Sequence, residues 1–216
     1  MDRVYVAGLG IALMCCLALL ALYPDRTPFS PLDRGGLGMW EFLQVFHNSS
    51  SGVTLLILEG PFTWNLSTYV EEGNELVIAG DWSLINSYLF YTLHVNGVVV
   101  SPLTIQWRDY YMNPSVVLLR DQGRIYALPY PNPIIGGKPV LQCGNYTLIS
   151  TLNYGRGEIV VVSTPYIFTN SFLGLFNNTA LLRDLFHGDR ARVLLSYQES
   201  PLDQARESIL GLLKIP

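Results

Sequence analysis

The sequence contains few charged residues. Only 14% of its 216 residues are Asp, Glu, Lys or Arg, whereas an average soluble domain has about 25%. Lysine occurs only at Lys138 and Lys214, and the basic residues form no cluster. Together with a net charge of −4, this composition argues against a nucleic-acid-binding surface. Because half of the residues are hydrophobic, we expect an apolar segment in addition to an ordinary core.

Cysteine and histidine are also scarce. Cys15 and Cys16 lie inside an apolar run, which leaves Cys143 without a partner for a disulfide within the domain. No expected helix lies near Cys143 to activate its thiol, so it is a poor candidate for a nucleophile. The histidines show neither an i, i+4 pair nor a cysteine companion, the patterns typical of metal sites. We therefore expect no metal and no cofactor. The three histidines are His47, His94 and His187.

The apolar excess is concentrated near the N-terminus. Residues 4–23, VYVAGLGIALMCCLALLALY, contain no charged side chain, and a helix of that length spans about 30 Å, the thickness of a bilayer core. The alternative is a cleavable signal peptide, whose apolar region is about 7–15 residues long and ends at small residues. This run is longer and closes on Ala21-Leu22-Tyr23-Pro24, a poor cleavage site. The sequence therefore predicts a transmembrane anchor over 1–24, with the lipid bilayer as the partner of residues 4–23.

The orientation of the expected anchor depends on asparagines, because positive charge is nearly balanced around the run. Four Asn-x-Ser/Thr triplets are acceptors for N-glycosylation, a modest excess over chance. They favour a domain that faces outward. We therefore expect a single-pass protein of the cell membrane, with another membrane or surface protein as a potential partner. The four triplets begin at Asn48, Asn65, Asn145 and Asn177.

The rest of the chain divides into a linker or loop over 25–36 and one domain over 37–216. Short apolar runs, bounded by turn residues, predict strands at 53–60, 75–81, 146–153, 158–164 and 191–197, with a tight turn from Gly155 to Gly157. Helical patterns at 37–47, 65–74, 82–95, 178–186 and 201–215 alternate with them. This order predicts an α/β fold with a mainly parallel sheet and helices on both faces. Residues 97–135, which five prolines interrupt, are expected to form an irregular, β-rich insertion.

Parallel sheets bind ligands beyond the carboxyl ends of their strands. That edge would carry Glu59, Asp81, Ser163 and Thr164. No Gly-x-Ser-x-Gly or Gly-x-Cys-x-Gly elbow surrounds Asp81, so helix capping is the simpler role for it. The stretch RGGLGMWE (34–41) nearly matches a dinucleotide-binding glycine pattern, but a glutamate replaces the third glycine and no strand precedes it. Turn geometry is the simpler role for these glycines. The remaining candidates at the edge are Ser30, Gly36 and Asn170.

Four stretches carry a resemblance to a known family: YVEEGNELVIAGD (69–81), YGRGEIVVVSTPYIFTN (154–170), NNTALLRDLF (177–186) and RVLLSYQES (192–200). They resemble a family of mostly archaeal and bacterial membrane-anchored proteins known as domain of unknown function 4350. The match covers about 29–198, without the middle lobe. The resemblance implies a flavodoxin-like or class I glutamine-amidotransferase-like sheet that lacks the catalytic triad. It also implies a neighbourhood of membrane-associated ATPase chaperone systems.

Two departures from the family pattern bear on activity. The family usually has Asp after the Ser of its best strand, where this chain has Thr164, and it often has an acidic residue where this chain has Ser196 to Gln198. Both argue against an enzyme. We expect a non-catalytic, outward-facing module that binds a protein or a ligand. The alternative is a membrane-tethered hydrolase or transferase with Glu59 or Asp81 as general base. A structural subunit of a surface assembly would require strong self-association.

Overall fold

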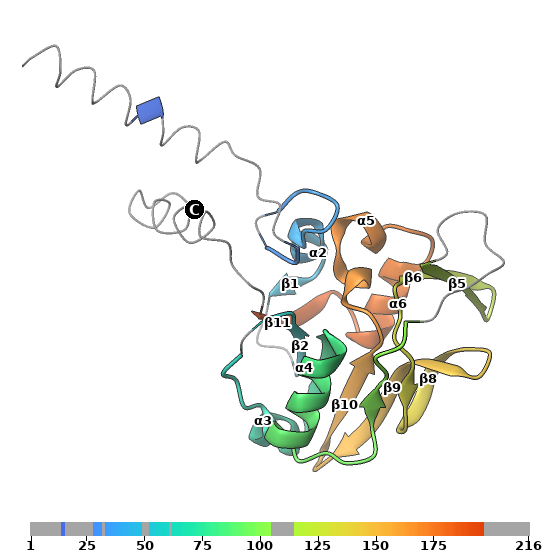
Figure 1. The fold of residues 1–216 in the computed structure, drawn as a ribbon. Coiled ribbons are helices and arrows are strands. Elements are labelled where there is room, and N and C mark those ends of the chain that lie inside the picture. Colours follow the sequence, from blue (N-terminus) through green and yellow to red (C-terminus); the bar gives the residue numbers. More distant parts are fainter. Residues whose placement is uncertain are drawn as a thin grey trace, which may run out of the picture.

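The computed structural model describes residues 14–15, 28–31, 33–48, 52–60, 62–104 and 115–196 (Figure 1). Within these residues, no helix has the length and apolar character needed to cross a bilayer. No described helix therefore supports the expected single-pass, outward-facing membrane protein. Met14 and Cys15 are the only described residues of the predicted span over 4–23. The rest of the span and the expected helix over 201–215 lie outside the described residues.

A nine-stranded sheet forms the centre of the described fold, with the order β1-β11-β2-β3-β10-β9-β7-β4 and with β8 paired to β9 (Figure 1). A separate hairpin consists of β5 and β6. The strands are β1 (His47–Asn48), β2 (Val53–Leu58), β3 (Glu75–Gly80), β4 (Val99–Val100), β5 (Val116–Asp121), β6 (Arg124–Pro129), β7 (Ile134–Ile135), β8 (Lys138–Cys143), β9 (Tyr146–Tyr154), β10 (Gly157–Val162) and β11 (Arg190–Ser196).

The prediction of a mainly parallel, flavodoxin-like sheet is wrong, although short helices do pack on both faces. Of the nine described strand pairings, the four that join β1, β11, β2, β3 and β10 are parallel and the other five are antiparallel. A two-residue turn at Gly155 and Arg156 joins β9 to β10, and so short a connection permits only antiparallel pairing. The chain between β3 and β10 thus contains, besides α4 and η1, the strands β4 to β9, whose described pairings are antiparallel.

The helices beside the sheet are short. The described α-helices have four to eight residues, whereas helices in globular proteins average about eleven or twelve. One turn of π-helix, η1, continues α4, and one 3₁₀ turn, η2, follows β10. These elements are α2 (Trp40–Val45), α3 (Ser67–Glu71), α4 (Trp82–Ser87), η1 (Tyr88–Thr92), η2 (Pro165–Phe168), α5 (Asn170–Leu173) and α6 (Asn178–Leu185).

Alternation of side chains along the strands divides the buried residues into two cores. Leu55 and Ile57 of β2 pack on one face with α2, α5, α6 and the β5–β6 hairpin. Leu56 and Leu58 pack on the other face with α3, α4 and η1. All six residues of β2 are buried, and each large aliphatic side chain contributes roughly 1.5–3 kcal/mol when it leaves water. Burial on both faces therefore fixes the strands that end at the candidate site.

The first core contains a cluster of phenylalanine rings. Phe42 of α2 lies 4.8 Å from Phe46 and 5.5 Å from Phe168, measured between ring centroids. Phe186, which follows α6, completes the cluster at 5.2 Å from Phe46. Four aromatic rings from three parts of the chain thus attach α2 and α6 to the same face of the sheet.

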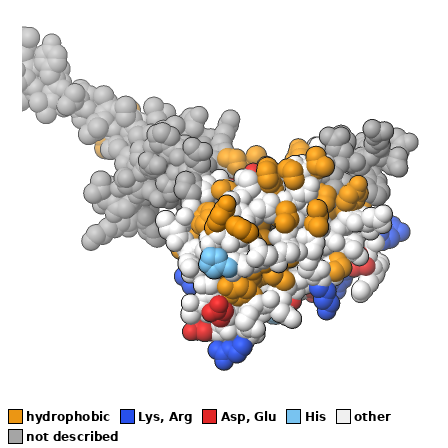
Figure 2. Space-filling view, turned by 60° about the horizontal axis from the view of Figure 1, so that its bottom comes forward, with side chains coloured by type: hydrophobic (Ala, Val, Ile, Leu, Met, Phe, Trp, Pro, Cys, Tyr) orange, Lys and Arg blue, Asp and Glu red, His pale blue; other side chains and the backbone are white. Residues whose placement is uncertain are grey.

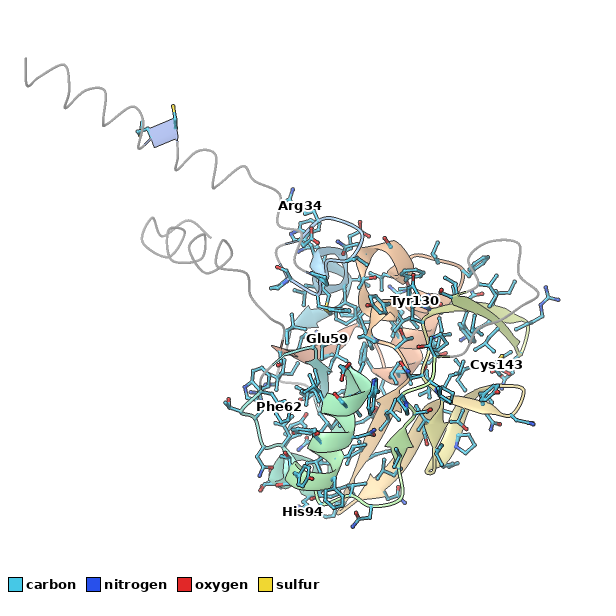
Figure 3. The ribbon with its side chains drawn as sticks, in the orientation of Figure 1. Arg34, Glu59, Phe62, His94, Tyr130 and Cys143 are labelled. Carbon is cyan, nitrogen blue, oxygen red and sulfur yellow. The ribbon has the colours of Figure 1, made fainter. Side chains whose placement is uncertain are left out.

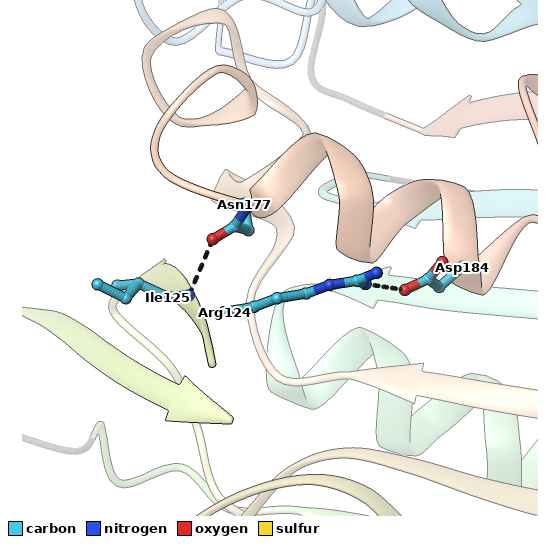
Figure 4. A network of polar contacts seen from close by, with 4 residues as sticks. All are labelled: Arg124, Ile125, Asn177 and Asp184. Carbon is cyan, nitrogen blue, oxygen red and sulfur yellow. Dashed lines mark hydrogen bonds and ion pairs between the residues drawn. The ribbon is translucent and has the colours of Figure 1, made fainter. Parts of the chain in front are cut away.

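Polar contacts attach the β5–β6 hairpin to α6 (Figure 4). Arg124 forms an ion pair with Asp184 at 2.5 Å, and the N–H of Ile125 donates to the side-chain oxygen of Asn177 at 2.9 Å. Asn178 is fully buried. Its amide accepts from the N–H of Ala127 at 2.9 Å and donates to the carbonyl oxygen of Ala127 at 2.8 Å. The insertion expected over 97–135 is thus tied to the domain through its second hairpin strand.

We expect Asn178→Ala to lower the free energy of unfolding by about 2 kcal/mol, because it leaves both backbone groups of Ala127 buried without their partner. Urea unfolding followed by circular dichroism measures the change. Asn153→Ala is the matched control, because Asn153 is an exposed asparagine on β9. Equal stability of Asn178→Ala and wild type would show that the hairpin does not depend on this contact.

Candidate functional site

The parallel strands deliver polar residues to one edge of the sheet. Glu59 follows β2, Asp81 follows β3, and Ser163 and Thr164 follow β10. The pairing continues beyond the strands, because the N–H of Glu59 donates to the carbonyl oxygen of Ser196 at 2.6 Å and the N–H of Asp81 donates to that of Leu58 at 2.8 Å. We call this group, with the aromatic residues described below, the Glu59 edge.

Glu59 is a carboxyl group at this edge with an unusually high pKa. Its side chain is partly buried, and none of the described residues forms a hydrogen bond with its carboxyl group. Burial, followed by the charge of Asp81, raises the pKa of Glu59 to about 7. A carboxyl group with that pKa exists in both protonation states near neutral pH, so it can donate or accept a proton. Figure 3 shows Glu59 at the end of β2, near the start of α4.

Asp81 acts as the N-cap of α4. Its Oδ1 accepts from the N–H of Ser83 at 2.8 Å and from that of Leu84 at 3.3 Å, and the hydroxyl of Ser83 donates to the same oxygen. These bonds satisfy the first N–H groups of the helix, as an aspartate N-cap does. The negative charge of Asp81 still influences Glu59. Asp81 thus contributes charge to the edge while its Oδ1 is engaged in capping.

Thr164 and Ser163 differ in how their hydroxyls are used. The Thr164 hydroxyl donates to the carbonyl oxygen of Pro129 at 2.5 Å and accepts from the N–H of Tyr166 at 3.3 Å, so it caps η2. The Ser163 hydroxyl is buried, and no described residue forms a hydrogen bond with it. Thr164 therefore has a structural role. Ser163 lies too deep to meet a ligand without movement of its neighbours.

Three aromatic side chains that the sequence did not predict complete the Glu59 edge. The ring of Tyr166 lies 5.3 Å from that of Phe29 and 5.5 Å from that of Tyr130. Burial, followed by the charge of Glu59 and the proximity of Tyr130, raises the pKa of Tyr166. Tyr130 is 43% exposed and is labelled in Figure 3. In the sequence Tyr130 is marked only by the prolines on either side of it, at 129 and 131, and this pattern does not by itself predict a site.

The backbone at two of these aromatic residues is strained. Phe29 has φ of 63° and Tyr130 has φ of 47°. Bulky L-residues rarely adopt this left-handed conformation, which costs roughly 1–3 kcal/mol at each position and occurs often at functional sites. The surrounding fold thus holds both rings beside Tyr166 against a local preference.

The glycine-rich loop over 33–38 packs against α5. Asn170 donates through its amide to the carbonyl oxygens of Asp33 at 3.0 Å and Gly35 at 2.7 Å. A Cβ on Gly36 would lie 2.2 Å from the hydroxyl of Ser171. Ser30, another candidate, is buried, and its carbonyl oxygen accepts from the N–H of Met39 at 3.0 Å. Ser30, Gly36 and Asn170 therefore stabilise a loop–helix contact, and the glycines permit close packing.

The expected glycosylation sites have different surroundings. Asn65 is exposed and its side-chain oxygen accepts from the N–H of Ser67 at 3.0 Å, while Asn145 is exposed in the turn between β8 and β9. Asn177 is partly buried and bound to Ile125. The side chain of Asn48 lies outside the described part of the structure. Asn65 and Asn145 are thus the more accessible acceptors.

Cys143 ends β8 and His187 follows α6, so neither belongs to the group that forms the Glu59 edge. Cys143 is buried, and burial raises the pKa of its thiol, which disfavours the reactive thiolate. His187 interacts with Glu75 at 2.9 Å, at the amino end of β3. Among the described residues, no group of three or more His, Cys, Asp or Glu side chains is placed to bind a metal ion.

No family model matches this chain, and no curated protein matches it. Twelve chains of solved structures match. A structure described as "mmIFT52 N-terminal domain" has a TM-score of 0.48 and 19% identity over 63% of this chain and 76% of its own. "Cytoplasmic Protein STM1381 from Salmonella typhimurium LT2" has a TM-score of 0.38 and 14% identity over 68% of this chain and 78% of its own. The exo-beta-1,4-mannosidase Op5Man5 from Opitutaceae bacterium strain TAV5 has a TM-score of 0.38 and 19% identity over 63% of this chain and 24% of its own. All three similarities are too low to carry an inference about function.

Proposed function

We propose that this chain is a non-catalytic binding module whose Glu59 edge recognises a polar group of a small ligand or of a partner protein. The observation that supports this proposal is that some polar residues at the edge are used for capping and others are not. Asp81 and Thr164 cap helical turns, whereas Glu59, Tyr130 and Tyr166 combine a titratable carboxyl group with two phenol rings. Such a mixture of aromatic surface and a few polar groups is typical of ligand sites.

The raised pKa of Glu59 favours one alternative, a hydrolase or transferase in which Glu59 is the general base. A base with a pKa of about 7 suits proton transfer at neutral pH. The nucleophile would then have to be water or a group of the substrate, because the Thr164 hydroxyl is engaged and Ser163 is buried. The proposed experiment therefore separates binding from turnover.

The full-length chain is screened by thermal shift against small amines, amides and carboxylic acids. We expect at least one compound to stabilise the wild type, and Glu59→Gln or Tyr166→Phe to weaken its binding about tenfold, the loss of roughly one hydrogen bond to a charged group. Glu72→Gln, which alters an exposed carboxylate after α3, is the control and should bind like the wild type.

Two outcomes would contradict the proposal. Stabilising compounds that bind the Glu59 and Tyr166 variants as tightly as the wild type would place binding elsewhere. Turnover of ester, amide or phosphate substrates that disappears in Glu59→Gln and persists in Glu72→Gln would instead support the enzyme.

A further inference from the structure

A groove lies at the other end of the helix that Asp81 caps. It has a volume of about 310 Å³ and is open to solvent along one side. It lies between η1 and the chain that leads into β4, near His94 at the bottom of Figure 3. No lining residue carries a charge. The lining consists of Asn86, Ser87, Phe90, Tyr91, Val95, Asn96, Gly97, Val98 and Val99.

The widened turn η1 presents two aromatic rings at this groove. The N–H of Leu93 donates to the carbonyl oxygen of Tyr88 at 3.0 Å, an i to i+5 bond that defines the π-helix. Such turns are rare and occur often at functional sites. Phe90 and Tyr91 are 53% and 73% exposed, and their ring centroids lie 4.8 Å apart with the planes at 89°. The two rings thus offer differently oriented apolar surfaces to solvent. Figure 2 shows hydrophobic side chains gathered on this side of the molecule.

Asn86 closes the edge of the sheet beside the groove. Its side-chain amide donates to the carbonyl oxygen of Val100 at 2.8 Å and accepts from the N–H of Val100 at 2.8 Å. Both backbone groups of Val100 on the free edge of β4 are therefore satisfied. An incoming peptide strand could not pair at this position, which argues against recognition by strand addition.

The chemistry of the lining indicates the class of ligand. A charged ligand would find no opposite charge in the groove, and a wholly apolar ligand would cover the side-chain amide of Asn96 and the hydroxyl of Tyr91 without offering them partners. A sugar ring has apolar C–H faces that stack on aromatic rings such as those of Phe90 and Tyr91, and its hydroxyl groups can both donate to and accept from the Asn96 amide and the Tyr91 hydroxyl. We propose that this groove binds a neutral saccharide chain.

The test uses an array of neutral oligosaccharides, hexamers of glucose, mannose, galactose, xylose and N-acetylglucosamine, probed with the full-length chain. Titration calorimetry then gives the affinity for each hexamer that binds. We expect at least one hexamer to bind, Tyr91→Ala to weaken it at least tenfold, and Tyr91→Phe to retain most of the affinity. Tyr146→Ala, which removes another exposed tyrosine at 49% exposure, should bind like the wild type.

Because Tyr91 is 73% exposed, its variants should fold, and thermal unfolding checks this directly. Failure of every hexamer to bind at millimolar concentration would overturn the proposal, as would undiminished binding by Tyr91→Ala. A concentration-dependent dimer that Tyr91→Ala dissociates, seen by light scattering, would also overturn it and would identify the surface as a contact between copies of this chain. None of these outcomes depends on the Glu59 edge.

Discussion

Gly80→Ala is expected to destabilise the fold by about 4 kcal/mol. Gly80 ends β3 beside Leu58 and has φ of 143°, a conformation that alanine adopts only with strain. An added Cβ would lie 2.1 Å from the carbonyl oxygen of Leu58, which is a backbone atom and cannot rotate away. The two strands would have to separate where they deliver Glu59 and Asp81. We therefore also expect loss of the 2.8 Å hydrogen bond from the N–H of Asp81 to the carbonyl oxygen of Leu58.

Chemical denaturation of Gly80→Ala and wild type, followed by tryptophan fluorescence, measures this loss. Gly174→Ala provides the matched control, because its φ of −85° suits alanine and a Cβ there would meet no atom within 4 Å. We expect the control to change the free energy of unfolding by less than about 1 kcal/mol. If both variants were equally stable, β2 and β3 would not be held in the close register described above.

The sequence predicted the strands that converge on the Glu59 edge because burial on both faces leaves a local signal. The apolar runs over 53–60 and 75–81 correspond to β2 and β3, which pair in parallel from Val53 with Glu75 to Leu58 with Gly80. Parallel neighbours end at the same edge, so the proximity of Glu59 and Asp81 followed from the order of elements. The capping role of Asp81 was likewise predicted from its place before a helix.

The prediction of a mainly parallel sheet was wrong because a run of apolar residues does not show whether a strand is parallel or antiparallel to its neighbours. β10 is apolar and buried over its last four residues, as parallel strands are, whereas β9 is buried only at four of its nine residues. The turn at Gly155 and Arg156 was visible in the sequence, and its length alone requires a hairpin. Connection length should therefore have outweighed hydrophobicity. The hydrophobic pattern also failed to predict helix type. Residues 82–95 have the pattern of one α-helix, but the chain changes to a π-helix at Tyr88.

The aromatic half of the Glu59 edge could not be predicted locally. Phe29, Tyr130 and Tyr166 come from a loop, the end of the β5–β6 hairpin and the turn after β10. Only the folded chain brings these segments together. A positive φ is usually indicated in a sequence by glycine or asparagine. Phe29 and Tyr130 are neither, so their positive φ could not be predicted. The groove beside η1 depends on a helix irregularity that has no simple sequence pattern.

Glu59→Gln is expected to stabilise the protein relative to the wild type at pH 8 by about 3 kcal/mol more than it does at pH 4. The pKa of Glu59 is about 7 in the folded chain and 4.5 in the absence of burial and neighbouring charge. The folded state therefore holds this proton more tightly than the unfolded state. The resulting stabilisation is complete below pH 4.5 and is lost as the pH rises to about 7. Glutamine cannot ionise, so the variant escapes that loss.

Urea unfolding of wild type, Glu59→Gln and the control Glu72→Gln at several values between pH 4 and pH 8 measures the difference. Comparison with the wild type at each pH cancels the contributions of the other ionisable groups, including Glu75, whose pKa burial also raises. The control should follow the wild type throughout. A constant difference between Glu59→Gln and wild type across this range would mean that Glu59 ionises as an exposed carboxylate does. Glu59 would then have neither the proton affinity expected of a general base nor the buried position from which the Glu59 edge is proposed to recognise its ligand.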